Sequence, residues 1–174
     1  ARALCTALTG EANVTLRRLA RDCFKDLTGT EGPETSPPPA SAPLPFAVTN
    51  TSGPELRFSV ETSRGTFTVA LSSSLAPWAV ASFAWLARRH FYDGLLWHRV
   101  VPDFVVQGGD PTGTGWGGAG YLLPGEPSAQ RFDRGAVGIA DAGLHTGGAQ
   151  WFVMHSRAPH LEGRYTKIGR VIEG

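Results

Sequence analysis

A proline-rich stretch divides the chain and restricts what the residues on either side of it can form. Residues 30–54 hold seven of the thirteen prolines, most of them within ETSPPPASAPLP. Proline lacks a backbone N–H and fixes φ, so such a segment favours neither a helix nor a sheet and is extended and semi-rigid. We therefore expect three parts: a helical segment at 1–29, a linker at 30–54 and a domain at 55–174. The linker is interpreted as a spacer rather than as a proline-rich ligand for another domain.

The segment at 1–29 has the periodicity of an amphipathic helix. Asn13 suits its N-cap and Gly29 its end. The sequence ALTG at 7–10 is echoed by DLTG at 26–29. This pattern fits the end of a HEAT-like array of helical repeats, and it fits a lone amphipathic helix equally well. The apolar residues that would share one face are Leu16, Leu19, Ala20, Cys23, Phe24 and Leu27.

The domain at 55–174 begins with the signature of a β-hairpin. LRFSVETSRGTFTVAL alternates apolar and polar residues on either side of Arg64 and Gly65. A helix is expected from Pro77, with Gly94 just past its end. Short strands are expected at 96–101, 104–107, 136–140, 151–154 and 167–172. One hairpin, one helix and a series of short strands predict an antiparallel barrel or sandwich with a helical cap.

Composition and charge exclude several classes of function. Apolar residues make up 41% of the chain, enough for a core, and the net charge of +1 gives no sign of a nucleic-acid partner or an electrostatic membrane anchor. No run approaches the eighteen apolar residues of a membrane span. The start at ARALCTALTG, without Met, and the stop at GRVIEG favour a piece of a longer protein. A cytoplasmic location and, with an upstream signal, an exported one both remain open.

Three common catalytic chemistries find no support in the sequence. The run GGDPTGTGWGGAG lacks the Gly-Lys-Ser/Thr ending of a phosphate loop and is interpreted as a mobile loop. The five histidines form no HxxxH or HxH pair, so no metal site is expected. There is no GxSxG motif, and Cys5 and Cys23 lie outside the predicted barrel, which leaves no candidate nucleophile.

One strand-like run carries polar residues that need an explanation. In WHRVVPDFVVQGG, Arg99 and Gln107 lie among apolar residues. A long polar side chain is costly to bury unless it is hydrogen-bonded. Taken alone, Arg99 could extend its head into solvent or pair with a buried carboxylate.

Three motifs in order resemble the cyclophilin-type peptidyl-prolyl cis-trans isomerases, and the bacterial branch most. They are FYDGLLWHRVVPDFVVQGGDPTGTGWGG, GAVGIADAGLHTGGAQWFVMHS and PHLEGRYTKIGRV. The resemblance implies a mainly β fold, a closed antiparallel eight-stranded barrel with capping helices. It also implies rotation about X-Pro bonds in proline-containing polypeptides to assist folding, with no metal and no cofactor. Family members continue past GRV with a helix and a strand, so a C-terminal truncation is expected.

The resemblance also assigns residues to the active groove. Arg99, Phe104 and Gln107 match the catalytic group. Two departures, His160 in place of Trp and Tyr165 in place of His, imply weak cyclosporin binding, and Asp141 replaces the usual Asn. The alternative function is a non-catalytic module that binds proline peptides on a helical-repeat scaffold. The substrate-binding residues implied are Val105, Ala140, Asp141, Gln150, Phe152, His160, Leu161 and Tyr165.

Overall fold

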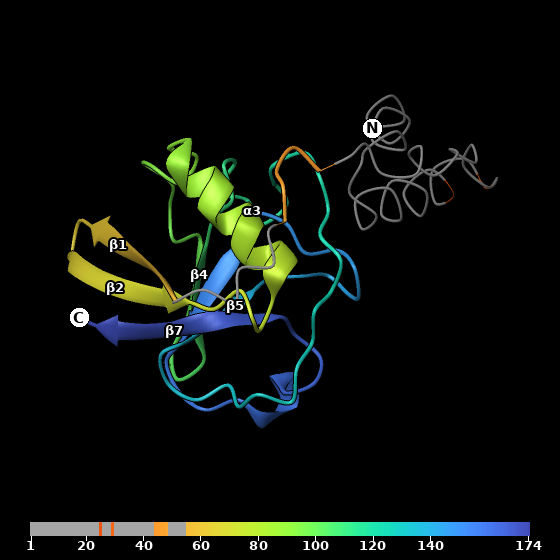
Figure 1. Ribbon diagram of the computed structural model, residues 1–174. Coiled ribbons are helices and arrows are strands. Elements are labelled where there is room, and N and C mark those ends of the chain that lie inside the picture. Colours follow the sequence, from red (N-terminus) through yellow and green to blue (C-terminus); the bar gives the residue numbers. More distant parts are fainter. Residues whose placement is uncertain (1–24, 26–28, 30–43, 49–54) are drawn as a thin grey trace. The chain divides into compact units, whose positions relative to one another are not determined.

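The computed structural model describes Lys25, Gly29 and residues 44–48 and 55–174 (Figure 1). Within this part of the chain the fold is mainly β, with one α-helix and one short 3-10 helix. The elements are β1 (Leu56–Thr62), β2 (Gly65–Leu71), α3 (Pro77–Arg88), β3 (Arg99–Val101), β4 (Val105–Gly108), β5 (Ala136–Ile139), β6 (Trp151–Met154), η1 (Pro159–Leu161) and β7 (Lys167–Glu173).

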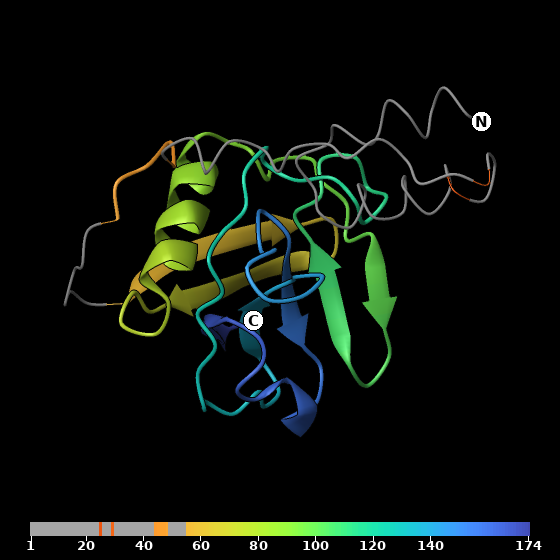
Figure 2. The ribbon, with the colours of Figure 1, turned by 90° about the vertical axis from the view of Figure 1, so that its right-hand side faces the viewer.

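The strands form one antiparallel sheet in the order β1-β2-β7-β5-β6-β4-β3. Figures 1 and 2 show that this sheet is strongly curled, with β1 and β2 running across the direction of β3 and β4. The expected closed barrel of eight strands is not seen in the described residues. Seven strands form a curled half-barrel, and its edge strands β1 and β3 do not pair with each other.

Helix α3 begins where the sequence predicts it and is the one α-helix described, where several capping helices were expected. Pro77 occupies its first turn, and Arg88 ends it. Glu126, far along the chain, caps its N-terminus: its carboxylate accepts the N–H of Trp78 at 3.1 Å and that of Ala79 at 2.9 Å. These are backbone donors that a helix leaves unpaired, and an acceptor in the first turn satisfies them.

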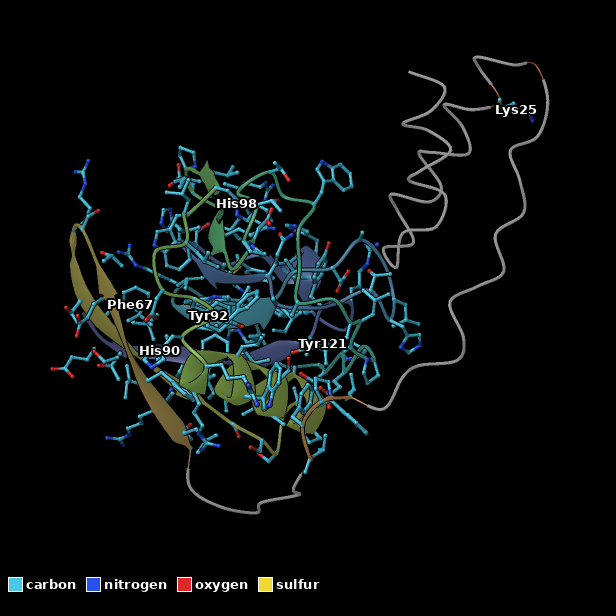
Figure 3. The ribbon with its side chains drawn as sticks, turned by 90° about the horizontal axis from the view of Figure 1, so that it is seen from above. Lys25, Phe67, His90, Tyr92, His98 and Tyr121 are labelled. Carbon is cyan, nitrogen blue, oxygen red and sulfur yellow. The ribbon has the colours of Figure 1, made fainter. Side chains whose placement is uncertain are left out.

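Aromatic rings join α3 to the sheet. Phe83, 3% exposed, lies with its ring centroid 5.2 Å from Phe58, 5.0 Å from Tyr92 and 5.4 Å from Trp151. Figure 3 shows Tyr92 between the helix and the strands. These rings border a hollow of about 840 Å³, called the β1 hollow below. Its lining comes from β1 and the residue after it (58–63), from α3 (Phe83, Ala87 and Arg88), from residues 92–97, and from Gly108, Gly109 and Trp151.

Several strand boundaries differ from expectation by one to three residues. The clearest are at β3 and β4: residues 96–98 precede β3 rather than belonging to it, and Phe104 lies in the turn before β4. The displacement of Phe104 is caused by the pair of residues that precedes it. Pro102 has no N–H to donate to a ladder, and Asp103 takes a φ of +55°, which interrupts an extended chain. The N–H of Phe104 closes the turn on the Val101 carbonyl at 3.1 Å.

Most of the predicted N-terminal helix and linker lie outside the described residues. At the helix end, Gly29 has a φ of +69° and donates its N–H to the Lys25 carbonyl at 2.8 Å, a geometry typical of a helix terminus. At the other end of the linker, the ring of Phe46 lies 6.0 Å from that of Trp85 in α3. In the part of the chain described, no helix has the length and apolarity to cross a bilayer.

Candidate active site

The register of four strands aligns the key side chains in one row. Arg99 of β3 lies opposite Gln107 of β4, Gln107 opposite Phe152 of β6, and Phe152 opposite Gly138 of β5. Directly opposed residues point to the same face of a sheet, so a cation, an amide and a ring come together. Gly138 makes room for the ring, because a Cβ there would lie 2.6 Å from the Phe152 Cζ.

This row opens into a pocket of about 260 Å³. The pocket lies against an apolar cluster that includes Phe132, Met154 and Ala158. The polar groups of Arg99, Gln107 and Asp141 therefore share the pocket lining with apolar and aromatic side chains. Every residue of the lining was singled out in the sequence: Arg99, Phe104, Val105, Gln107, Ala140, Asp141, Phe152, Leu161 and Tyr165.

A chain of hydrogen bonds leads from Arg99 into the protein. Nη1 of Arg99 donates to Oε1 of Gln107 at 3.3 Å, and Nε2 of Gln107 donates to Oε1 of Gln150 at 2.9 Å. Nε2 of Gln150 then donates to the carbonyls of Gly115 and Gly117, each at 2.9 Å. Because both amides are engaged on both sides, their orientations are determined. Gln107 consequently turns its carbonyl oxygen toward the exposed guanidinium of Arg99.

The glycine-rich run at 108–120 is held in place by a buried carboxylate. Asp110 is 1% exposed and accepts hydrogen bonds from Thr112 and from the Gly115 N–H. Burial acts to raise the pKa of Asp110, but hydrogen bonds from Thr112, Gly115 and Gly117 outweigh it and lower the pKa below its ordinary value. A Cβ on Gly117 would lie 2.0 Å from Oδ1 of Asp110, so glycine is required there.

This network was missed when the run was interpreted as a mobile loop. The signal available in the sequence was Asp-Pro-Thr-Gly, since an aspartate side chain readily accepts the N–H two residues on. No signal in the sequence indicated the contact between the loop and Gln150. The carbonyls of Gly115 and Gly117 meet Gln150, which lies more than thirty residues away.

Two predicted site residues, Gln150 and His160, lie outside the pocket lining. Gln150 lies behind Gln107 and holds it, as described above. The His160 ring stacks on that of Phe104, with centroids 5.5 Å apart and planes 28° apart. The guanidinium carbon of Arg99 lies 5.7 Å from the same Phe104 ring. Phe104 thus contacts both His160 and Arg99 at the edge of the pocket.

The opposite side of the pocket is built from three segments. The N–H of Ala140 donates to the Gln150 carbonyl at 3.0 Å, which ties this wall to β6. Asp141 is half-buried, and burial raises the pKa of its carboxyl although the Gly143 N–H donates to Oδ1 at 3.1 Å. The Tyr165 ring meets Phe152 edge-on at 6.2 Å, and the Tyr165 N–H binds the Leu161 carbonyl at 3.0 Å.

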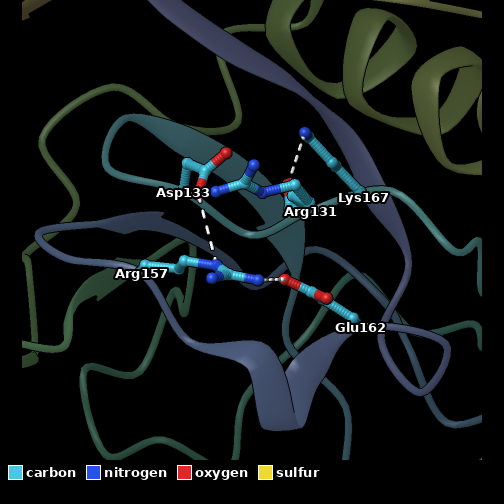
Figure 4. Close-up of polar contacts among 5 residues, drawn as sticks. All are labelled: Arg131, Asp133, Arg157, Glu162 and Lys167. Atoms are coloured by element: carbon cyan, nitrogen blue, oxygen red, sulfur yellow. Dashed lines mark hydrogen bonds and ion pairs between the residues drawn. The ribbon is translucent and has the colours of Figure 1, made fainter.

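An ion-pair network joins two segments that carry residues of the pocket and of the apolar cluster beside it (Figure 4). Arg157 lies 3.5 Å from Asp133 and 3.5 Å from Glu162, which links the segments that carry Phe132 and Leu161. The ring of Phe132 in turn stacks on that of Phe152 at 5.9 Å. Half-exposed ion pairs contribute only about 0–1 kcal/mol each, so their effect here is mainly on position. The ion-pair residues Asp133, Arg157 and Glu162 were not identified from the sequence.

The described residues contain no group of three His, Cys, Asp or Glu side chains that could hold a metal ion. The pocket lining offers one guanidinium, the Gln107 amide, the Asp141 carboxylate, the Tyr165 side chain and apolar side chains. Such a site can bind an apolar ring and donate a hydrogen bond beside it.

The chain was compared with known proteins. The family model described as "Cyclophilin type peptidyl-prolyl cis-trans isomerase/CLD" matches residues 57–174. A peptidyl-prolyl cis-trans isomerase of Synechococcus elongatus is 44% identical over 111 residues, which cover 64% of this chain and 77% of that protein. Peptidyl-prolyl cis-trans isomerase B of Bacillus subtilis is 48% identical over 101 residues, covering 57% and 71% of the two chains.

Solved structures agree with this. A crystal structure of a cyclophilin-type isomerase of Cryptosporidium parvum matches with a TM-score of 0.67 and 32% identity, covering 69% of this chain and 79% of that one. A second crystal structure of the same protein, in the presence of the dipeptide Ala-Pro, matches with a TM-score of 0.64 and 33% identity, over 67% and 78% of the chains. Motifs, fold and relatives agree, and the chain belongs to the cyclophilin-type peptidyl-prolyl cis-trans isomerase family.

Proposed function

We propose that the pocket beside Arg99 binds the proline of an X-Pro segment and that Arg99 catalyses rotation of the preceding peptide bond, which assists the folding of polypeptides. The observation that carries this proposal is the anchored guanidinium. Arg99 is hydrogen-bonded to Gln107 at the mouth of a small apolar pocket. The Ala-Pro dipeptide named for the Cryptosporidium relative supports a proline-containing ligand for this pocket.

The chemistry follows from the electronic structure of the amide. Rotation about the bond is resisted by roughly 20 kcal/mol, because the nitrogen lone pair is delocalised into the carbonyl. Midway through the rotation that delocalisation is lost, and the prolyl nitrogen becomes a hydrogen-bond acceptor. It is not an acceptor in either planar ground state. A donor placed beside it therefore stabilises the twisted state selectively, which is the requirement for catalysis.

Arginine suits this task because it remains charged at every relevant pH and offers several N–H donors. With one of these donors used on Gln107, the others remain available to the prolyl nitrogen. Phe104, Val105, Phe152 and Leu161 would hold the proline ring while the preceding carbonyl moves. An acceleration of about 10⁵-fold needs about 7 kcal/mol of selective stabilisation. Atoms and protons all stay in place, so no nucleophile or cofactor enters this mechanism.

The alternative, a non-catalytic module for proline peptides, has no support from the relatives, which are named as isomerases. Ala140 and Asp141, which line the pocket, would contact the substrate backbone in either case. What distinguishes the two functions is the guanidinium. A binding module needs only the apolar walls, whereas rotation needs the donor as well.

Isomerisation of an X-Pro peptide, followed by a protease-coupled assay, tests the proposal. The protein should accelerate the reaction, and Arg99→Ala should lose about 10²–10³-fold in kcat/KM, the usual effect of removing one transition-state donor. Arg88→Ala is the matched control, since Arg88 lines the β1 hollow and should leave the rate unchanged. Equal rates for Arg99→Ala and the unaltered protein would refute the assignment.

We further infer that the barrel is completed by an eighth strand along β1, in line with the family resemblance. The support is that β1 is an edge strand of the sheet formed by the described residues and lies beside the β1 hollow, because an edge strand presents unpaired backbone groups. The order proposed for the chain is helical segment 1–29, spacer 30–54 and isomerase domain 55–174. Hydrogen exchange tests the edge: the outward amides of β1 should exchange faster than those of β2, and equal protection would contradict this.

A further inference from the structure

Asp141 differs from the other partly buried carboxylates among the described residues. Asp133 and Glu162 have arginine partners (Figure 4). Asp110 and Glu126 each accept at least two hydrogen bonds. Asp141 has one hydrogen bond, from the Gly143 N–H to Oδ1, and forms no ion pair with a described residue.

The surroundings of Asp141 fix its position without neutralising its charge. Thr146 accepts the Ala142 N–H at 2.8 Å and donates to the Gly143 carbonyl at 2.6 Å, which closes a compact turn behind the carboxylate. Burial raises the pKa of Asp141, so the single hydrogen bond does not offset the cost of holding the charge there. Arg99 lines the same pocket, but its guanidinium is directed to Gln107 and makes no ion pair with Asp141.

We propose that Asp141 is a specificity-determining residue that makes the enzyme prefer substrates with lysine or arginine next to the proline. The inference rests on the proposed function of the pocket. A proline ring fills only part of a pocket of about 260 Å³, so the lining, which includes Asp141, also meets a residue next to the proline. Because residues of an extended chain lie about 3.4 Å apart, a group that reaches the carboxylate in this lining belongs to a neighbour of the proline. A cationic side chain there supplies the missing charge partner of Asp141.

The experiment uses three peptides that differ only at the residue before proline: lysine, its uncharged analogue norleucine, and glutamate. A second set places the same three residues after proline. The kcat/KM of each is measured by NMR exchange at low and at high salt. In one of the two sets, the kcat/KM of the lysine peptide should exceed that of the norleucine peptide by about three- to fivefold, as for a partly exposed ion pair. The kcat/KM of the glutamate peptide should lie below that of the norleucine peptide. At about 0.5 M salt the ratios should approach one, because salt screens the charges.

Variants separate charge from shape. Asp141→Asn should bring the lysine-to-norleucine ratio close to one at both salt concentrations, whatever its absolute rate. Asp103→Asn is the matched control: this exposed aspartate lies outside the pocket lining, and asparagine tolerates its positive φ. It should keep the lysine preference.

Failure of this inference is distinguishable from failure of the proposed function. If the unaltered protein isomerises the norleucine peptides through Arg99 but shows no lysine preference in either set, the specificity assignment is wrong and the catalytic one stands. A lysine preference that persists in Asp141→Asn also overturns the assignment. If no peptide is isomerised, both proposals fail.

Discussion

Trp151 and Phe152 are neighbours on β6, yet they line two different cavities. Trp151 borders the β1 hollow, and Phe152 forms part of the pocket beside Arg99. The alternation of side chains along a strand separates them. The two cavities differ in chemistry. The larger is bordered by a cluster of aromatic rings, whereas the smaller combines apolar walls with a hydrogen-bond chain that ends on Arg99.

The comparison teaches that size does not identify the active site. The β1 hollow has about 840 Å³ and the pocket about 260 Å³. Of the two, it is the pocket in which a guanidinium hydrogen-bonded to a neighbouring amide lies beside apolar side chains, in a space large enough for a proline ring. Rings in the hollow contribute to the stability of the fold, and under the proposed function rings in the pocket would also hold the substrate.

Among the variants that compare the two cavities, the largest effect is expected from replacing the neighbouring aromatic rings of β6, Trp151 and Phe152. Trp151→Leu and Phe152→Leu should each lower the free energy of unfolding by roughly 2–3 kcal/mol, because each removes buried ring atoms. Only Phe152→Leu should also lower kcat/KM per folded molecule, by about tenfold. Urea unfolding and a peptide assay on the same samples measure both. A comparable loss of activity in Trp151→Leu would remove the distinction between the cavities.

The second prediction concerns the carboxylate that holds the glycine-rich loop. Because the pKa of Asp110 is lowered below 3.8 in the folded protein, its ionised form stabilises the fold above pH 3.8. That contribution is lost as the pH falls through the folded-state pKa. Asp110→Asn should therefore cost about 1.5–3 kcal/mol at pH 6, and the cost should shrink below about pH 3.8. A deficit in thermal stability that stays constant down to pH 3 would contradict this.

The third prediction concerns the hydrogen-bond chain behind Arg99. Gln150→Leu has a similar volume but cannot bind Gln107, Gly115 or Gly117, so Arg99 loses its fixed support. We expect kcat to fall about tenfold, equivalent to about 1.4 kcal/mol, with a smaller change in KM. Tyr92→Phe is the control beside the β1 hollow, since it removes the 3.3 Å hydrogen bond from the Tyr92 hydroxyl to the Ala149 carbonyl and leaves the Gln150 amide in place. Steady-state rates equal to those of Tyr92→Phe would show that the chain does not position Arg99.

The smallest effect is expected for cyclosporin. His160 stacks on Phe104 at the edge of the pocket, and an imidazole offers less apolar contact area than an indole. His160→Trp should tighten inhibition by about three- to tenfold while leaving the β1 hollow unchanged. Inhibition of the unaltered protein at nanomolar cyclosporin would show that His160 does not weaken cyclosporin binding.

Features that depend on residues close together in the sequence could be predicted, and features that depend on distant residues could not. The hairpin, the helix and the strands were predicted from local periodicity, and their predicted bounds lie within a few residues of the observed ones. Phe104 is an exception in kind, because Pro102 and Asp103 place it in a turn rather than in the strand. The residues around the pocket came from family motifs, since no local pattern marks Arg99 as different from any other arginine in a strand. Their roles remain proposals. The Glu126 cap on α3 and the Gln150 contacts with the loop join distant segments, and no local rule reveals such pairs.

The central claim is that Arg99 acts on the twisted peptide bond and not on the bound ground state. NMR exchange spectroscopy on an X-Pro peptide gives both the Kd and the rate of interconversion while the peptide is bound. For Arg99→Ala, we predict that the bound interconversion rate falls about 10²–10³-fold while the Kd changes by less than about threefold. A variant that keeps the rate of the bound peptide and merely binds it more weakly would contradict the account.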